Sequence, residues 1–341
     1  MLRVHFTDAD LAAVHVALRP DPLWETVLGL QQLTHPGQGP VVFASWRRRA
    51  SAELSERHLI PMARLLTTLA PVGEPYFPDF LTPAESAAGL ADGLAALRAT
   101  PAPRLLGELA MLVQKVPRPL PTMGWLRGLA AGDRERLEEV SDAVRLLHGA
   151  VIAPDWSRTA LGVEVDRVAR MQALLEGGVH GLLRSLRPVA QWRSPVLYAP
   201  YPVDRDLYLG GRGLRLVPSR FCWRTSVALA DPELPPVLVY PIQHTYMDFA
   251  CPTVRSQRQE TLSNLLGATR CRVLTELQNA ASTGGLARRL AISAAAASKH
   301  TKALREANLV ASRREGSSVV HTVTPLGLAL LRGELPTGDL P

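Results

Sequence analysis

The chain has 341 residues, of which 47% are hydrophobic and 20% charged, and its formal net charge is +7. This hydrophobic content excludes a disordered chain, and the length predicts two domains. Three scattered cysteines exclude a disulfide framework and a paired-cysteine zinc site. Because no apolar run is long enough to cross a bilayer and the N-terminus has no secretory pattern, we expect a cytoplasmic protein without a membrane partner.

The excess positive charge is concentrated near the C-terminus. Residues 255–335 hold 12 Lys and Arg against 5 Asp and Glu, and the rest of the chain has 26 of each sign. A basic segment beside a neutral one is expected when one domain binds nucleic acid. We therefore predict a regulatory, dimerisation or ligand-sensing domain over 1–250 and a DNA-binding domain over 258–335.

The first 188 residues have a mainly helical pattern. Leu2–Phe6 alternates between apolar and polar residues, and Thr7 is suited to cap a helix from Asp8. Further helices, separated by joints rich in Pro and Gly, are predicted at Ala52–Leu69, Pro83–Arg98, Pro103–Lys115, Arg134–Ala150 and Val163–Leu186.

Short apolar runs between turn residues follow Pro188 and predict the strands of one small sheet. These strands are Val196–Tyr198, Leu207–Leu209, Leu214–Val217, Phe221–Trp223 and Val237–Tyr240. The glycine-rich segment Gly210–Gly213 is predicted to be a hairpin turn, and Pro241–Pro252 to connect the two domains. The aromatic residues between Trp192 and Tyr246 form either the core of the sheet or the wall of an apolar pocket for a small molecule.

The basic segment begins with helical patterns. Arg258–Gln278 is predicted to form one or two helices, and Ser282 or Thr283 can cap a short helix through Leu286–Leu290. After a tight turn, Ser293 can cap a second helix.

This second helix is predicted over Ala294–Ala307, and Asn308 can end it in the left-handed conformation. Two strands and a last helix then follow, at Val310–Arg314, Val319–Val323 and Leu326–Arg332. Two helices joined by a short turn and followed by a basic β-hairpin make a winged helix-turn-helix, whose second helix fills the major groove of DNA. The predicted fold class is α+β, with a mainly helical N-terminal domain that has a small β-sheet, followed by a C-terminal winged helix-turn-helix.

An ordered series of motifs over residues 258–333 resembles the ArsR-type winged-helix repressors. These motifs are Leu286-Ala287-Arg288-Arg289-Leu290, Ser298-Lys299-His300, Leu304-Arg305-Glu306-Ala307-Asn308-Leu309-Val310 and Arg313-Arg314-Glu315-Gly316. The preceding region, in Gly210–Val217 and Val237–Pro241, resembles the long N-terminal regions of ArsR-like regulators from actinomycetes.

The resemblance implies a dimeric repressor that binds an inverted repeat in double-stranded DNA, with the first and last helices of the module as the dimer contact. The matching segments are Leu262–Leu277 and Leu326–Leu331. Many relatives sense metals through Cys, His or acidic residues on the first helix of the helix-turn-helix or on the last helix. Here Thr283–Leu290 and Leu326–Gly333 contain no Cys, His or Asp, so we expect no metal and no other cofactor.

Position in the module defines the candidate DNA contacts. They lie at the start of the second helix and on the hairpin, and they are Ser293, Ala295, Ala296, Ser298, Lys299, His300, Lys302, Arg313, Arg314 and Ser317. The alternatives are a solvated helix face for the lysines, a packing role for His300 and a hairpin kept soluble by its charge. Because Ala294–Ala297 can only touch thymine methyl groups, we expect modest direct readout and a larger share from phosphate contacts and DNA shape.

Two other functions remain open from the sequence. One is an enzyme with an appended DNA-binding module, which the absence of GxSxG, GxxxxGK[ST] and GxGxxG motifs disfavours. The other is a winged helix that binds protein, which the concentrated charge disfavours. His244, Asp248 and Cys251 have the spacing of metal ligands on one helix face, although a linker is the alternative, and we predict neither a metal site nor catalytic residues. The other histidines outside the recognition helix are expected at the surface or in capping positions.

Overall fold

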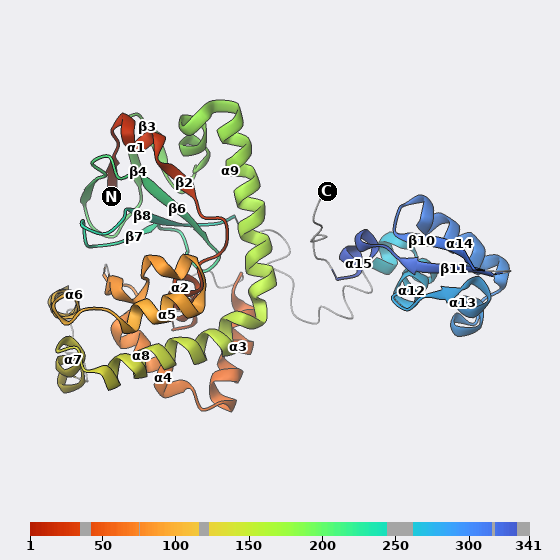
Figure 1. Ribbon diagram of the computed structural model, residues 1–341, viewed down its shortest axis with the longest axis horizontal. Helices are drawn as coiled ribbons and strands as arrows, with labels where there is room; N and C mark the ends of the chain where they lie inside the picture. The colour runs from red at the N-terminus through yellow and green to blue at the C-terminus, as the bar shows by residue number, and fades with distance from the viewer. Residues whose placement is uncertain (35–41, 75, 116–122, 244–261, 316–317, 333–341) are drawn as a thin grey trace. The chain divides into compact units, whose positions relative to one another are not determined.

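The computed structural model describes residues 1–34, 42–74, 76–115, 123–243, 262–315 and 318–332. The chain divides into two compact units, 1–249 and 250–341, which are described separately (Figure 1). Both units combine helices with small sheets, so the predicted α+β class is confirmed. Within the described ranges, no helix combines the length and the apolar character needed to span a membrane.

The N-terminal unit contains two four-stranded sheets, with the orders β3-β4-β1-β5 and β2-β6-β8-β7. The strands are β1 (Leu2–His5), β2 (Val14–Val16), β3 (Gln191–Arg193), β4 (Val196–Ala199), β5 (Arg205–Tyr208), β6 (Leu214–Ser219), β7 (Val227–Ala228) and β8 (Val237–Pro241). The prediction of one small sheet was therefore wrong. It missed that β1 pairs with both β4 and β5, and that β2 pairs with β6.

The segment Gly210–Gly213 is not a hairpin turn. The strand before it, β5, belongs to the first sheet, and the strand after it, β6, belongs to the second. Three of its glycines have positive φ, and a Cβ on Gly213 would lie 2.3 Å from the carbonyl oxygen of Ala13. The glycines thus allow the chain to change sheets while passing close to the backbone at the end of α1 (Asp8–Ala12).

The sheet that contains β6 and β8 is buried on both faces. Val217 and Val239 belong to the core shared with the helices, whereas Leu216 and Leu238 belong to the core shared with the other sheet. Every residue of β8 is buried, which explains its continuous apolar sequence.

Most helices of this unit gather at one end of it, beneath the sheets (Figure 1). The α-helices are α2 (Pro22–Thr34), α3 (Ala44–Glu56), α4 (Ile60–Leu69), α5 (Leu90–Arg98), α6 (Ala102–Lys115), α7 (Met123–Ala130), α8 (Arg134–Leu147) and α9 (Trp156–Ser185). Short 3-10 turns lie at η1 (Asp79–Leu81), η2 (Ala84–Ala87) and η4 (Ala153–Asp155), and a π-turn lies at η3 (His148–Ile152).

Three predicted helices are interrupted, and in Val163–Leu186 the break lies at the non-helical residues Gly177 and Gly178. Ala52–Leu69 breaks at His58, whose φ is 55°, where the amide of Leu59 donates to the carbonyl of Leu54 and α3 ends. The proline at position 61 fits only the first turn of the new helix α4. Pro83–Arg98 divides likewise at Gly89 into η2 and α5.

The predicted strand Phe221–Trp223 is a loop, because its amides bind a buried carboxylate. Glu25 of α2 is fully buried, and its carboxylate accepts from the amides of Arg220 at 2.9 Å and Phe221 at 3.1 Å. The hydroxyl of Ser219 donates to it as well, at 3.1 Å. These backbone donors are therefore not available to a neighbouring strand. Phe221 packs instead against the ring of Trp46, as part of the helical core.

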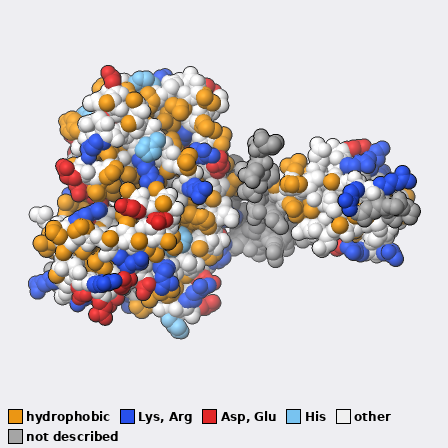
Figure 2. All heavy atoms as spheres, in the orientation of Figure 1, with side chains coloured by type: hydrophobic (Ala, Val, Ile, Leu, Met, Phe, Trp, Pro, Cys, Tyr) orange, Lys and Arg blue, Asp and Glu red, His pale blue; other side chains and the backbone are white. Residues whose placement is uncertain are grey.

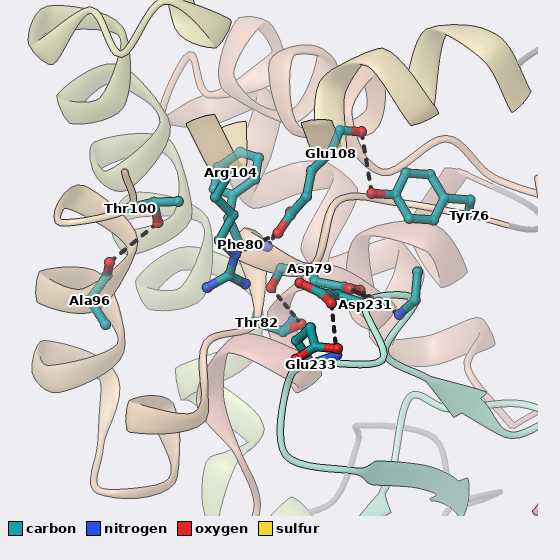
Figure 3. A network of polar contacts seen from close by, with 11 residues as sticks. Tyr76, Asp79, Phe80, Thr82, Ala96, Thr100, Arg104, Glu108, Asp231 and Glu233 are labelled. Carbon is teal, nitrogen blue, oxygen red and sulfur yellow. Dashed lines mark hydrogen bonds and ion pairs between the residues drawn. The ribbon is translucent and has the colours of Figure 1, made fainter. Parts of the chain in front are cut away.

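A second buried carboxylate network joins the helices to the loop between β7 and β8 (Figure 3). Asp79 accepts from the amides of Ala230 and Asp231, and Glu108 accepts from the amide of Phe80 at 2.7 Å. Arg104 lies 2.6 Å from Glu108. Burial raises the pKa of both Asp79 and Glu108. This network fixes α6 and η1 on the strand loop.

The C-terminal unit is a small helical module with a three-stranded sheet in the order β10-β11-β9. Its elements are α12 (Ala268–Glu276), β9 (Ala281–Ser282), α13 (Thr283–Leu290), α14 (Ala294–Glu306), β10 (Val310–Glu315), β11 (Ser318–Val323) and α15 (Pro325–Arg332). Residues 262–266 are also helical and are separated from α12 by Gly267, with φ of 89°. The module has a separate aliphatic core of ten buried residues.

Candidate nucleic-acid interface

The two central helices of the module, α13 and α14, are held by caps at their N-termini. Ser282 caps α13 by accepting from the amide of Gly285 at 3.1 Å, which decides between the two capping residues that the sequence allowed. Ala291 adopts the left-handed conformation and turns the chain sharply. Ser293 then caps α14, accepting from the amide of Ala296 at 3.1 Å. The two caps and the turn between them together set the angle between α13 and α14.

One side of α14 is buried in the core of the module. Ala297, Thr301 and Leu304 are 0%, 3% and 2% exposed, and they recur with helical spacing. The Thr301 hydroxyl is satisfied within the helix, because it donates to the carbonyl of Ala297 at 2.9 Å. This buried stripe determines which side chains of α14 point outward.

The opposite side of α14 is exposed and basic. Ala295, Lys299, Lys302 and Glu306 follow one another at helical spacing on this side, and all four are exposed. Lys302 Nζ lies 3.9 Å from Glu306 Oε1 near the end of the helix. Because a carboxylate repels phosphate, the first half of α14, around Lys299, is better suited to nucleic acid than the end of the helix at Glu306.

The remaining predicted contacts on α14 differ in exposure. Ser293 and Ser298 are exposed, whereas Ala296 and His300 are half-buried. The hydroxyl oxygen of Ser293 is engaged as the helix cap, so its first role is structural. Ala294 and Ala295 are exposed and Ala296 is half-buried at the start of the helix. Their small side chains would let the backbone of a binding partner approach closely.

The β-hairpin formed by β10 and β11 carries the predicted wing residues. Arg313 and Arg314 are both exposed. In the antiparallel register Arg313 lies opposite Val320 and Arg314 opposite Val319, so the two arginines point to different faces of the hairpin. Ser317 lies outside the described residues.

His321 of β11 links the hairpin to the first helix of the pair. It is only 6% exposed, with its Nδ1 2.7 Å from Ser312 Oγ and its Nε2 2.9 Å from Thr283 Oγ1. Burial and the charge of Arg305 lower the pKa of His321, so the imidazole is neutral at neutral pH. The expectation of a surface or capping histidine was wrong here. The sequence does contain a signal for this position. Val319, His321 and Val323 are two residues apart, so all three lie on one face of the strand, and His321 shares the face of two valines.

The surface of this unit is rich in positive charge. Figure 2 shows several groups of blue Lys and Arg side chains on the visible face of this unit. Exposed basic residues lie on α12, α13, α14 and β10, and the described ones are Arg270, Arg272, Arg288, Arg289, Lys299, Lys302, Arg305, Arg313 and Arg314. The described acidic side chains of this unit are those of Glu276, near Arg289, and Glu306, near Lys302.

One set of residues in the sequence has the spacing of metal ligands on a helix face. The spaced residues His244, Asp248 and Cys251 lie outside the described residues. Among the residues that are described, no group of three or more His, Cys, Asp or Glu side chains could hold a metal ion.

Comparison with known proteins supports the assignment of the module. Residues 265–313 match the family model described as a helix-turn-helix domain. The match spans α12, α13 and α14 and ends in β10. No curated protein and no solved structure matches the chain. The C-terminal unit thus contains a helix-turn-helix domain, within which α13 and α14 are joined by the sharp turn at Ala291.

Proposed function

We propose that the protein is a transcriptional regulator that binds double-stranded DNA through α14 and the β10–β11 hairpin. The observation that carries this proposal is the division of α14 into a buried stripe and an exposed basic face around Lys299, in a unit that holds nearly all of the net positive charge of the chain. In a helix-turn-helix, the second helix lies in the major groove and the first braces it. The proposal assigns the chain no catalytic activity and no cofactor.

The contacts that we propose fall into two groups. Lys299, Lys302, Arg313 and Arg314 bind phosphates, since each is exposed and basic. The alanines and Ser298 approach the bases, where alanine distinguishes only the thymine methyl group. We therefore expect moderate sequence specificity and a strong dependence of affinity on salt.

We further propose a dimeric repressor of the ArsR type, which the resemblance of the module supports. The dimer contact that the resemblance implies, 262–277 with 326–331, contains two exposed leucines, Leu265 at 73% and Leu326 at 48%. A two-fold dimer would read an inverted repeat. The N-terminal unit, which is a separate compact unit with 26 Lys and Arg against 25 Asp and Glu, would regulate DNA binding by organising the dimer or by sensing a small molecule.

Salt-dependent DNA binding tests the proposal. The full chain is titrated with DNA from upstream of its own gene and with random DNA, at salt concentrations from about 50 to 200 mM. Lys299→Ala should weaken binding and lower the slope of log affinity against log salt by about 1. Lys115→Ala, which removes the third lysine of the chain from an exposed site at the end of α6, is the matched control.

Unchanged salt dependence in Lys299→Ala would remove α14 from the DNA contact. If the chain binds no DNA, from its own upstream region or from a random genomic pool, the proposal fails and the module is a protein-binding winged helix instead.

A further inference from the structure

The outer side of α9 carries a stripe of exposed apolar side chains. They are Val165 at 51%, Val168 at 50%, Met171 at 47%, Leu174 at 43% and Leu175 at 79% exposed. Within the described residues, no other helix has more than two exposed large hydrophobic side chains. Asp166 and Arg170, on the opposite side of the helix, are buried and hydrogen-bonded to each other at 2.8 Å. Exposed apolar surface of this kind marks an interaction site.

The helix is firmly attached to its own unit, so the stripe is presented on a fixed support. Arg170 also donates to Ser185 Oγ at 2.9 Å, beyond the break at Gly177 and Gly178, and Tyr240 of β8 donates to Asp166. In Figure 1, α9 runs along one side of the N-terminal unit. Its residues up to 176 form one uninterrupted helix.

The charges beside the stripe favour a protein partner over a membrane. Helices that bind membranes carry Lys and Arg along the polar face. Here both signs occur along α9. Glu164, in line with Val168 and Leu175 on the helix surface, is paired to Arg167 at 2.6 Å, and Glu176 accepts from Gln172 at 2.6 Å. Apolar side chains combined with charges of both signs have the composition of a protein interface.

The arrangement of charge along α9 is complementary to a second copy of the same helix. Arg158 and Glu176 are eighteen residues apart, which is five turns of 3.6 residues, so they lie on the same line of the helix surface. In an antiparallel pair related by a two-fold axis, Arg158 of one copy meets Glu176 of the other when the axis passes near residue 167.

The apolar stripe has its centre at nearly the same place. Leu161, which is half-buried, and Leu175 lie on the same side of α9, and the midpoint between them is Val168. Val165 and Met171 have the same midpoint. One two-fold axis near Val168 therefore aligns the apolar residues and pairs the opposite charges at both ends.

We propose that α9 is a dimer interface, in which the stripe packs antiparallel against the same stripe of a second copy with Val168 at the two-fold axis. This contact does not depend on DNA binding. It adds to the contact proposed in the helix-turn-helix module, and it gives the N-terminal unit a defined role in holding two recognition helices together.

The mass of the full chain in solution is the first test. The wild-type protein should have twice the 37.0 kDa mass of the chain. In the double variant Val168→Glu, Leu175→Glu the dimer should dissociate at least tenfold more readily. Leu106→Glu on α6, where the native leucine is 59% exposed, is the control and should leave the dimer unchanged. A monomeric wild type, or equal dissociation of all variants, would overturn the proposal.

Charge reversal tests the antiparallel register. Arg158→Glu and Glu176→Arg should each weaken the dimer by about three- to tenfold, since each exposed pair contributes modestly and occurs twice. The double reversal should restore the wild-type affinity. Additive losses in the double variant would exclude this pairing.

Disulfide formation in Val168→Cys distinguishes dimerisation through α9 from dimerisation through the helix-turn-helix module. With the residue at the two-fold axis, mild oxidation should give a covalent dimer, whereas Leu106→Cys should not. Both variants are made in a Cys251→Ser chain, and the remaining native cysteines, Cys222 and Cys271, are buried and should not react. If the chain has the mass of a dimer but Val168→Cys gives no covalent dimer, the dimer contact lies in the module alone. This conclusion would hold whatever the affinity of the protein for DNA.

Discussion

The Nε2 atom of His321 lies 2.9 Å from the hydroxyl oxygen of Thr283, so a strand of the wing is bonded directly to the first residue of α13. Its Nδ1 atom meets Ser312 on the neighbouring strand. A neutral imidazole donates through one nitrogen and accepts through the other, which matches two hydroxyl partners. The wing and the helix-turn-helix therefore form one rigid unit.

We expect His321→Ala to destabilise the module by about 2 kcal/mol, because the hydroxyl groups of two half-buried residues lose their partner. Labelling of the buried Cys271 thiol in urea, located by mass spectrometry, reports on this unit alone. His300→Ala, at a half-buried surface position, is the control and should leave labelling unchanged.

The same histidine predicts a pH dependence. The folded-state pKa of His321 is lowered from 6.5, so the unfolded chain binds the proton more tightly. The stability that it contributes is complete above pH 6.5 and declines as the pH falls below that value. Wild-type labelling of Cys271 should therefore require less urea at pH 5.5 than at pH 7.5, and this difference should shrink in His321→Ala. An unchanged difference would mean that other groups cause it.

Ser293 should affect stability and DNA binding separately. Loss of the cap in Ser293→Ala costs about 1 kcal/mol of helix stability. Ser293→Asp keeps a capping oxygen and favours the helix N-terminus, but it brings a negative charge to the end of α14 that we place near phosphates. The aspartate variant should thus retain wild-type stability in urea and bind DNA more weakly. Equal DNA affinity would place this end of α14 away from the backbone of DNA.

The sequence predicted the elements of the C-terminal unit closely because its signals are local. A serine before each central helix, and Asn308 with φ of 56° after the second, mark boundaries within a few residues of the structure that they create. The exposed face of α14 could be predicted for the same reason, since helical spacing alone separates Lys299 from the buried Ala297.

The N-terminal unit depends on contacts that no local pattern contains. Leu2 pairs with Ala199 and Arg205, about 200 positions away in the chain, so the two-sheet arrangement could not be inferred from neighbouring residues. The run at Phe221 has the composition of a strand, but its amide is bound by Glu25 from a distant helix. Only the fold shows that the carboxylate is there.

Substitution of two glycines of the module by alanine should change its stability in opposite directions. A Cβ on Gly327 of α15 would lie 2.3 Å from the carbonyl oxygen of Leu309, which cannot move without disturbing the wing. Gly327→Ala should lower stability by about 1–3 kcal/mol. Gly284, on α13, has no atom within 4 Å of its Cβ position, so Gly284→Ala should raise stability by about 0.5–1 kcal/mol. Urea dependence of Cys271 labelling measures both, and a destabilised Gly284→Ala would show that this turn of α13 needs glycine.

Glu25 makes the stability of the N-terminal unit depend on pH. Complete burial raises the pKa of its carboxyl from 4.5 to about 7, against the opposing effect of its three hydrogen-bond donors. The folded unit therefore holds the proton more tightly than the unfolded chain. The stability due to this group is complete below pH 4.5 and is lost as the pH rises toward 7, by about 3 kcal/mol over the whole range.

Tryptophan fluorescence in urea isolates this effect, because all six tryptophans precede residue 224 and so belong to the N-terminal unit. Asp21, Asp79 and Glu108 also have raised pKa values and contribute with the same sign. Glu25→Gln removes only one titrating group. It should be less stable than wild type at pH 5, because an amide nitrogen then faces a backbone donor, and should lose less stability between pH 5 and 8. If both proteins lose the same stability over that interval, Glu25 is already ionised in the folded unit, and its hydrogen bonds to Ser219, Arg220 and Phe221 outweigh its burial.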